Sequence, residues 1–587
     1  MTTYRVPQQE LRFILDNLVN YQQHCTMLGF EDAGIEMVEA ILPEAAKFFE
    51  QVVAPTNWPA NTQPAYLEDG EVITSKALDG VYPQMVEAGW CSLSGSTAYG
   101  GAGLPGVVDA VVQEMLQSAN MSFSLLPTLT RGVIYALNLY GTQQQKNRYL
   151  HKLISGVWSG TMDLTESQAG SDLSAVQTKA ISEGDHYLIS GQKIYISWGE
   201  HQQAENIIHL VLARLPDAPK GNEGISLFLV PKYLIDDDGT LGQRNDVKAV
   251  GVEHKLGIHS SPTCTLAFGD DGGAVGYLVG PKNKGLMCMF SMMNHARLAV
   301  GHQGIAVSER AYQQAVEYAS QRVQGAAQGI EGRLTIINHP DVKRMLMQMR
   351  ALTEAGRAMS LFTIAAQDCA THHPDKTVRI ENAQRVEIMT PLVKGWCTDL
   401  AMETTSLGIQ VHGGMGFIEE TGAAQHMRDA RILPIYEGTN GIQALDFIGR
   451  KCLRDKGSGI QQLITEMTQT FDNQRTQSQP IKSLLASLLS TVDQCQSALA
   501  HITEQPHKAP FVAHQFMMLF GNSIAYWQLL ILACAAHSKI DAGDSDKFLS
   551  QKIATAQFYQ SQILPRNHAH LEAIIADSAF MDYLNFD

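Results

Sequence analysis

In residues 428–443, the carboxylate of Glu437 stands between the ring of Tyr436 and the small, flexible run Gly-Thr-Asn-Gly at 438–441. The apolar run Ile-Leu-Pro-Ile at 432–435 leads into it, so we expect Glu437 in a pocket wall rather than on an open face. A carboxylate in such surroundings is a candidate general base. A glutamate before a glycine is also common at helix ends and turns, so this interpretation depends on the rest of the chain.

The composition narrows the classes of protein to consider. The chain has 587 residues, 45% apolar and 17% charged, a mixture typical of a globular protein with several domains. Its net charge of −16 argues against a nucleic-acid partner, because phosphate binding needs a basic stripe. Nine cysteines without a C-x-x-C pair indicate reduced thiols, a cytoplasmic location and no structural zinc or other metal site.

Two segments bear on targeting and membranes. The N-terminal residues MTTYRVPQQELRFIL lack the basic region, apolar core and cleavage site of a signal peptide. The most apolar window, residues 516–536, is interrupted by Asn522, Ser523 and Gln528. We therefore expect a buried helix there and no transmembrane segment.

The elements that must position Glu437 alternate in type along the chain. Residues 1–160 have helical periodicity, residues 161–285 alternate as strands do, residues 286–450 return to helical periodicity, and residues 451–587 form a further helical extension. Strands are expected at 207–214, 225–230 and 263–268, and two more at 186–196 around a turn at Gly191. This order predicts an α+β fold with a middle β-barrel or sandwich domain between helical domains, rather than a doubly wound sheet.

A glycine pattern at residues 101–106 suggests dinucleotide binding, but its surroundings do not support that interpretation. Gly101, Gly103 and Gly106 satisfy G-x-G-x-x-G before a helical stretch, but the residues before them, C-S-L-S-G-S-T-A, are small and polar. A dinucleotide fold requires an apolar strand there. The segment is therefore interpreted as a turn that leads into a helix.

Four segments in order resemble motifs of the acyl-CoA dehydrogenase family. Residues 162–172, M-D-L-T-E-S-Q-A-G-S-D, resemble the flavin-binding T-E-P-x-A-G-S-D, with Ser167 in place of the proline. Residues 191–197 resemble the G-x-K-x-W/Y-I-T/S strand, residues 410–417 the Q-x-x-G-G-x-G-F segment, and residues 428–443 the catalytic segment. Together they form a specific signal, although each alone could be an ordinary strand, turn or helix end.

The resemblance implies an FAD cofactor and a set of contacts for it. Ser197 would contact the flavin nitrogen that receives hydride, Tyr195 would pack on the isoalloxazine, and Arg322 would bind the pyrophosphate, a task suited to a charged fork. Gln324 stands where the family often has phenylalanine, so the contact with the adenine of FAD would differ from the usual one. The full set of expected FAD contacts is Met162, Leu164, Thr165, Gly170, Ser171, Tyr195, Ser197, Arg322, Gln410, Gly413, Gly414, Thr439 and Asn440.

The resemblance also implies the reaction, with Glu437 removing the proton next to the thioester carbonyl while hydride leaves the next carbon for the flavin. The product would be a trans-2-enoyl-CoA, and the Glu437 N–H and a ribityl hydroxyl would stabilise the charge on the thioester oxygen. Expected substrate contacts are Ser171, Asn294, Arg297, Tyr436 and Gly438. His412 is interpreted as a packing residue rather than a catalyst.

The resemblance extends to quaternary structure and partners. The 451–587 extension and an insertion at 326–338 resemble a long form of the family, which includes 3-(methylthio)propanoyl-CoA dehydrogenases and broad-range acyl-CoA dehydrogenases. Electron-transferring flavoprotein would be the electron acceptor, and the chain would form a homodimer or homotetramer. The alternatives are an acyl-CoA oxidase that uses oxygen, a nucleic-acid-associated flavoprotein of the same fold, which the charge opposes, and a non-catalytic flavoprotein scaffold, which the intact Glu437 loop opposes.

Overall fold

The computed structural model describes residues 3–326, 332–474, 478–577, 583 and 585. Part of the insertion expected at 326–338 therefore lies outside the described residues. The chain divides into two compact units: unit 1 comprises Met1–Pro43, Pro105–Glu114 and Val300–Asp587, and unit 2 comprises Glu44–Leu104 and Met115–Ala299.

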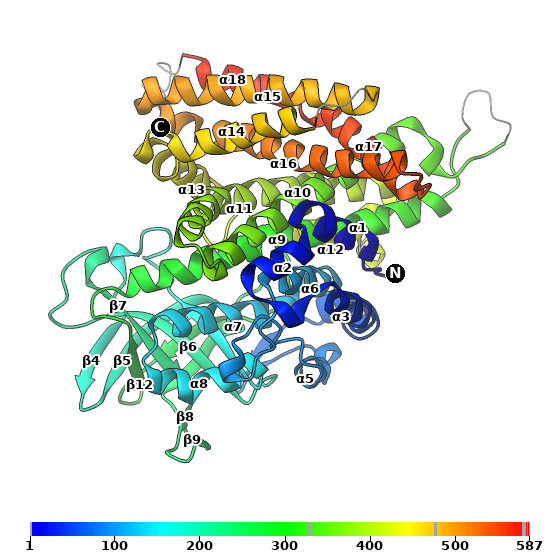
Figure 1. Cartoon of the computed structure of the whole chain (residues 1–587). Helices are drawn as coiled ribbons and strands as arrows, with labels where there is room; N and C mark the ends of the chain where they lie inside the picture. Colours follow the sequence, from blue (N-terminus) through cyan, green and yellow to red (C-terminus); the bar gives the residue numbers. More distant parts are fainter. Residues whose placement is uncertain (1–2, 327–331, 475–477, 578–582, 584, 586–587) are drawn as a thin grey trace. The chain divides into compact units, whose positions relative to one another are not determined.

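Unit 2 contains the β domain, and strands β4, β5, β6, β7 and β12 of its sheet are labelled in Figure 1. The sheet has eight strands in the order β10-β11-β5-β12-β7-β6-β3, with β4 paired to both β5 and β6. Its strands are β3 (Trp158–Asp163), β4 (Lys179–Glu183), β5 (His186–Ser197), β6 (Asn206–Arg214), β7 (Ile225–Pro231), β10 (Val247–Val252), β11 (Thr263–Phe268) and β12 (Ala274–Val279). Two hairpins, β1 (Tyr66–Glu68) with β2 (Glu71–Ile73) and β8 (Tyr233–Ile235) with β9 (Leu241–Arg244), accompany the sheet. Its helices are α4 (Asn57–Asn61), α5 (Val81–Glu87), α7 (Met121–Tyr140) and α8 (Gln143–Ser155).

The two faces of strand β6 show why this domain forms. Leu210 lies in a core cluster with Val133 and Leu137 of helix α7, whereas Val211 lies in a second cluster with residues of β10 and β11. Successive side chains of a strand point to opposite faces, so a strand covered on both sides reads as a continuous apolar run. The run Ile-Ile-His-Leu-Val-Leu-Ala at 207–213 is buried throughout.

Strand β5 differs from the prediction of two strands around a turn at Gly191. The strand is continuous, but its first half pairs with β12 and β4 and its second half with β11. Gly191 has a φ of +150°, and a Cβ at this position would lie 2.6 Å from the Thr178 hydroxyl. The glycine therefore allows the strand to change partners without breaking, which periodicity alone could not separate from a turn.

Unit 1 is helical. Its helices are α1 (Gln8–Ile14), α2 (Tyr21–Leu28), α10 (Pro340–His372), α11 (Lys376–His412), α12 (Ala423–Ala430), α13 (Asn440–Leu445), α14 (Ser458–Asn473), α15 (Gln479–Glu504), α16 (Ala509–Asp541), α17 (Lys547–Phe558) and α18 (Arg566–Ile575). Helices α3 (Ile35–Phe48), α6 (Gly106–Ala119) and α9 (Gly285–Gln321) contribute residues to both units. The observed elements confirm an α+β fold with helical regions, a middle β domain and a helical extension.

Helix α16 contains the apolar window that the sequence placed in a buried helix. Among the described residues, one helix, Pro506–Asp541, is long and apolar enough to cross a membrane, and 89% of its most apolar window is buried. Phe516, Phe520 and Trp527 all lie in the core of unit 1. This burial matches a core helix of the unit.

The glycine motif at 101–106 leads into a helix, as expected. Residues 101–105 form a loop, and α6 begins at Gly106. The Asp368 carboxylate accepts hydrogen bonds from the N–H groups of Gly106 and Val107 at 2.9 and 3.1 Å. A protein carboxylate therefore occupies the helix N-terminus where a dinucleotide fold would bind pyrophosphate.

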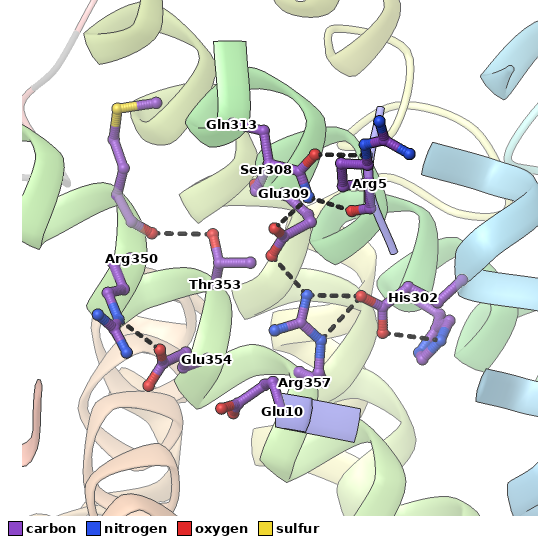
Figure 2. Close-up of polar contacts among 12 residues, drawn as sticks. Arg5, Glu10, His302, Ser308, Glu309, Gln313, Arg350, Thr353, Glu354 and Arg357 are labelled. Atoms are coloured by element: carbon purple, nitrogen blue, oxygen red, sulfur yellow. Dashed lines mark hydrogen bonds and ion pairs between the residues drawn. The ribbon is translucent and has the colours of Figure 1, made fainter. Parts of the chain in front are cut away.

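A buried network of charges joins the helices of unit 1, and Figure 2 draws the part of it around Arg357. The Arg357 guanidinium donates to Glu114 at 2.8 Å and to Glu309 at 2.7 Å. The Lys552 ammonium of α17 donates to Glu10 of α1 at 2.6 Å and to Glu354 of α10 at 2.8 Å. Buried charges of this kind are tolerated only when they are paired, so the network specifies how α1, α10 and the extension pack.

Candidate active site

The loop that carries Glu437 has an unusual backbone. Glu437 has a φ of +56°, and Gly438 follows with a φ of +86°. A left-handed conformation costs a residue with a Cβ roughly 1–2 kcal/mol, and the cost is usually met by surrounding contacts. The side chain is partly buried, whereas Leu433 before it is fully buried and Ile435 is 46% exposed.

Two side chains fix the carbonyls of this loop. The Lys394 ammonium of α11 is fully buried and donates to the Gly438 carbonyl at 2.7 Å. The Gln443 amide donates at 3.3 Å to the carbonyls of both Glu437 and Gly438. The strained turn is therefore held by donors from the helices on either side of it in sequence.

The Asn440 side chain connects the loop to α11. Its Oδ1 accepts from Lys394 at 2.9 Å, and its Nδ2 donates to the Gly395 carbonyl, to Thr398 and to Asp399. These partners occupy both polar atoms, so a cofactor contact by Asn440 would not use its side chain in this arrangement. Thr439, the other residue expected to contact the cofactor here, caps α13 by accepting a hydrogen bond from Ile442 N–H.

Tyr436 is partly buried, and its hydroxyl donates to the Oε1 of Gln303. Burial, reinforced by the nearby Glu437 carboxylate, raises the pKa of the Tyr436 hydroxyl far above its usual range. The phenol therefore stays neutral and fixes one side of the Glu437 loop. Its ring fits the expected role in a pocket wall.

The segment expected to bind flavin lies in unit 2 and is fastened to strand β5. The backbone carbonyl of Thr165 accepts a hydrogen bond from the Ile194 N–H at 2.9 Å. The Lys193 ammonium donates to the Leu164 carbonyl at 3.0 Å. The structure therefore brings residues 162–165 beside the strand that carries Tyr195 and Ser197. The resemblance implies that both segments contact the flavin, and their closeness in the fold is compatible with that prediction.

A buried ion pair holds the turn of this segment. The Lys193 ammonium lies 2.8 Å from Glu166, and the two side chains are 0% and 6% exposed. Burial acts to raise the pKa of Glu166, but Lys193, with hydrogen bonds from Thr178 and Gln177, lowers that pKa to about 2. Glu166 is thus a carboxylate that anchors the loop rather than an acid that exchanges protons.

Gln168 stiffens the turn where this chain lacks the family proline. Its amide donates to Glu166 at 2.6 Å and to the Ala175 carbonyl at 3.1 Å. A proline restricts a turn by fixing φ, and hydrogen bonds across the turn restrict it by another route. Ser167 in place of proline is therefore compatible with an ordered loop.

The surfaces expected to meet FAD fit such a group. Tyr195 has a φ of +62° and its side chain is 61% exposed, an exposed ring on a strand that Ser197 ends. A Cβ at Gly170, Gly413 or Gly414 would meet no atom within 4 Å, which leaves open space at these backbones. Within the described residues, the hydroxyls of Thr165, Ser171 and Ser197 make no hydrogen bond to the protein. Apolar surface beside free hydroxyls suits a flavin ring and its polar edge.

The remaining expected contacts divide between the units. In unit 2, Arg297 donates to Asn294 Oδ1 at 3.1 Å, so the two expected substrate residues lie together on α9. In unit 1, Arg322 is exposed after α9 and Gln410 is exposed near the end of α11. His412 is buried, donates from Nδ1 to the Gly408 carbonyl at 2.7 Å and stacks on Tyr318, which agrees with a packing role.

Sequence reasoning missed the residues that support the site. Lys394 stands in the apolar run T-P-L-V-K-G-W, and a lysine in such a run signals a buried partner. Glu166 and Lys193 belong to the recognised motifs, but no motif indicates that they pair with each other. Asp399 carries no signal in the sequence, and the segment 428–443 includes Gln443 without indicating its role, because both roles depend on packing.

Family models match four successive segments of the chain. The N-terminal, middle and C-terminal domain models of acyl-CoA dehydrogenase match residues 36–157, 161–270 and 283–453, and an acetyl-CoA dehydrogenase C-terminal-like model matches residues 463–583. The 3-methylmercaptopropionyl-CoA dehydrogenase of Ruegeria pomeroyi is 45% identical over 96% of this chain and 96% of that protein. The chain belongs to the acyl-CoA dehydrogenase family. It is an FAD-dependent oxidoreductase of this family, as the motifs predicted.

Other relatives support the same family and fold. The broad-specificity linear acyl-CoA dehydrogenase FadE5 of Mycobacterium tuberculosis is 34% identical over 96% of each chain. The structure of Caenorhabditis elegans ACDH-11 with C11-CoA shares the fold, with a TM-score of 0.78 at 20% identity over 98% of this chain and 96% of that chain. A chain from a structure of the electron transferring flavoprotein of Acidaminococcus fermentans is 26% identical, with a TM-score of 0.57, over 70% of this chain and 96% of that chain.

Proposed function

We propose that Glu437 is the base that removes the α-proton of an acyl-CoA thioester, and that the product is the trans-2-enoyl-CoA. The left-handed backbone at Glu437 carries this assignment, because Lys394 and Gln443 hold the carbonyls of a conformation that would otherwise relax. Strain that the surrounding structure maintains is typical of functional positions. Bound FAD would supply the hydride acceptor.

Charge on the thioester oxygen must be stabilised for a carboxylate to remove so weak an acid. We assign this task to the Glu437 N–H together with a ribityl hydroxyl of the cofactor. Tyr436 and Gly438 would line the acyl group, and Ser171, Asn294 and Arg297 would contact the rest of the substrate. The hydrogen bond between Arg297 and Asn294 keeps these two side chains oriented together.

Glu437→Gln tests the base, because it keeps the size of the side chain and removes its basicity. Loss of a general base should slow the anaerobic bleaching of FAD by acyl-CoA by roughly 10²–10⁴-fold. Glu419→Gln is the control, since Glu419 is an exposed glutamate that pairs with Arg428 in the same unit. Near wild-type bleaching in the Glu437 variant would exclude this residue as the base.

The relative at 45% identity indicates which substrate to try first. We propose 3-methylmercaptopropionyl-CoA as a candidate, with linear acyl-CoAs as competitors because a second relative has broad linear specificity. One methylene in an apolar pocket changes discrimination by roughly 1–3 kcal/mol, so kcat/KM must be compared across graded chain lengths. A higher kcat/KM for a linear acyl-CoA would exclude the thioether as preferred substrate.

We propose electron-transferring flavoprotein as the electron acceptor and a cytoplasmic role in fatty acid β-oxidation. The similar chain from an electron transferring flavoprotein structure supports the acceptor, and nine free cysteines, all but Cys91 buried, support a reducing compartment. Anaerobic reduction by substrate followed by air separates a dehydrogenase from an oxidase. Rapid peroxide release would overturn the proposed acceptor.

We also propose a homodimer or homotetramer. Met415, Phe417 and Ile418, beside Gly413 and Gly414, are 49%, 84% and 45% exposed, a cluster of apolar side chains that favours coverage by a second copy. Phe417→Ser should shift the mass measured by light scattering towards the monomer. An unchanged mass would show that the cluster is not needed for assembly.

A further inference from the structure

Helix α16 of the extension packs directly behind the part of α11 that holds the catalytic loop. A Cβ on Gly395 would lie 2.4 Å from Met517 Sδ, and one on Gly521 would lie 2.3 Å from the Trp396 ring. The Trp396 indole also donates to Asn522 at 2.8 Å. Glycine on each helix therefore faces a large side chain of the other, which gives a close and specific contact.

A chain of hydrogen bonds continues this contact to the loop. His514 of α16 lies 3.2 Å from Asp399 Oδ2, and Asp399 Oδ1 accepts from Asn440 at 2.7 Å. Asn440 in turn accepts from Lys394, whose ammonium also donates to the Gly438 carbonyl. All of these residues belong to unit 1.

We propose that α16 is a positioning element for the catalytic base, with His514 setting the orientation of Asp399 and, through Asn440 and Lys394, of the backbone at Gly438. This gives the extension a role in turnover, one that rests on the proposed function of Glu437. Among the described residues, His514 hydrogen-bonds to Asp399 and not to the loop or to the groups assigned to substrate, so it is a positioning residue and not a catalytic one. Asn440 is buried and held by several hydrogen bonds, so a shift of the Asp399 side chain should also shift Asn440 and the backbone at Gly438.

The side chain of His514 is 53% exposed, so its removal should leave the fold intact. In the full-length, FAD-loaded enzyme, His514→Ala should lower kcat by about three- to tenfold and leave KM for acyl-CoA within about twofold, because misplacing a reacting group costs rate more than binding. His514→Gln should recover most of kcat, since its amide can donate to Asp399. Backbone hydrogen exchange in residues 436–443 should be faster in the alanine variant and near wild type in the glutamine variant.

His537→Gln is the matched control, because His537 pairs with Asp541 at 3.3 Å on the same helix, about two dozen residues from His514. It should change neither kcat nor exchange in the loop. An unchanged kcat and unchanged loop exchange in His514→Ala would overturn the positioning role. Glu437→Gln separates the two proposals: if it bleaches FAD normally, the base assignment fails, whereas an inactive Glu437→Gln beside a fully active His514→Ala refutes only the role of α16.

Discussion

Replacing Lys193 with methionine tests how the flavin segment is held. The change keeps much of the side-chain volume but removes the cation that lies 2.8 Å from Glu166 and 3.0 Å from the Leu164 carbonyl. A buried carboxylate left without its partner destabilises a fold by roughly 3–5 kcal/mol. We therefore expect a loss of this size in the free energy of unfolding of the β domain, together with faster release of FAD.

The pKa of Glu166 gives a second estimate of how much this ion pair contributes to the free energy of unfolding. The folded state lowers it from 4.5 to about 2, a difference that corresponds to roughly 3 kcal/mol. Because the folded pKa is lowered, the stabilisation is complete above about pH 4.5 and is lost as pH falls towards 2. The difference between wild type and Lys193→Met should be constant from pH 7 to pH 5 and shrink below pH 4.5.

Urea denaturation at pH 7, 5 and 4, with FAD fluorescence as the measure of release, checks this expectation. Lys248→Met is the matched control, since Lys248 pairs with Asp270 at 3.2 Å on the surface of the same domain and should contribute little. The double variant Glu166→Gln, Lys193→Met should regain much of the lost stability, because no charge is left unpaired. A Lys193→Met protein with wild-type denaturation and FAD retention would refute the anchoring role of the pair.

Three further changes test other parts of the structure. Gly438→Ala should cost about 1–2 kcal/mol, measured by denaturation, and lower turnover by at least about tenfold, because alanine resists the observed φ of +86°. Arg357→Met should lower the free energy of unfolding by roughly 3–5 kcal/mol, because it leaves the buried carboxylates of Glu114 and Glu309 without their cation. A loss below about 1 kcal/mol in guanidinium denaturation would contradict the role of Arg357 in the network of Figure 2. Asn120→Ala should cost about 1 kcal/mol in the same assay, because the side chain caps α7 by accepting from Phe123 N–H.

The sequence was sufficient for the fold class because the periodicity is strong where elements are long. Helices α10 and α11 and strand β6 follow from apolar spacing alone, and burial of residues 516–536 follows from polar residues within an apolar window. The continuous β5 could not be predicted, because a glycine that lets a strand change partners looks like a glycine in a turn. That distinction depends on the closeness of Thr178, whose hydroxyl would lie 2.6 Å from a Cβ at Gly191.

The proposed site residues could be identified from the sequence, but the residues that support them could not. Glu437 and Tyr195 stand in segments that resemble motifs of the acyl-CoA dehydrogenase family, and the resemblance implies their roles. Lys394, Asp399 and His514 act on the loop through helix packing, and no local pattern reports which residues of α11 and α16 meet. Asn440 illustrates the difference, because the motif marks it for the cofactor while the structure uses its side chain to join the loop to α11.

The ion pair between Glu10 and Lys552 has a consequence for biosynthesis. The two residues are 542 positions apart, so a ribosome adding about 5–20 residues per second delivers Lys552 roughly half a minute to two minutes after Glu10. Unit 2 lies within residues 44–299 and is synthesised completely in that interval, whereas Glu10 of α1 gains the ammonium that donates to it only when α17 has been made. Co-translational folding is thus open to the β domain, and the helical unit completes its core only after α17 has left the exit tunnel.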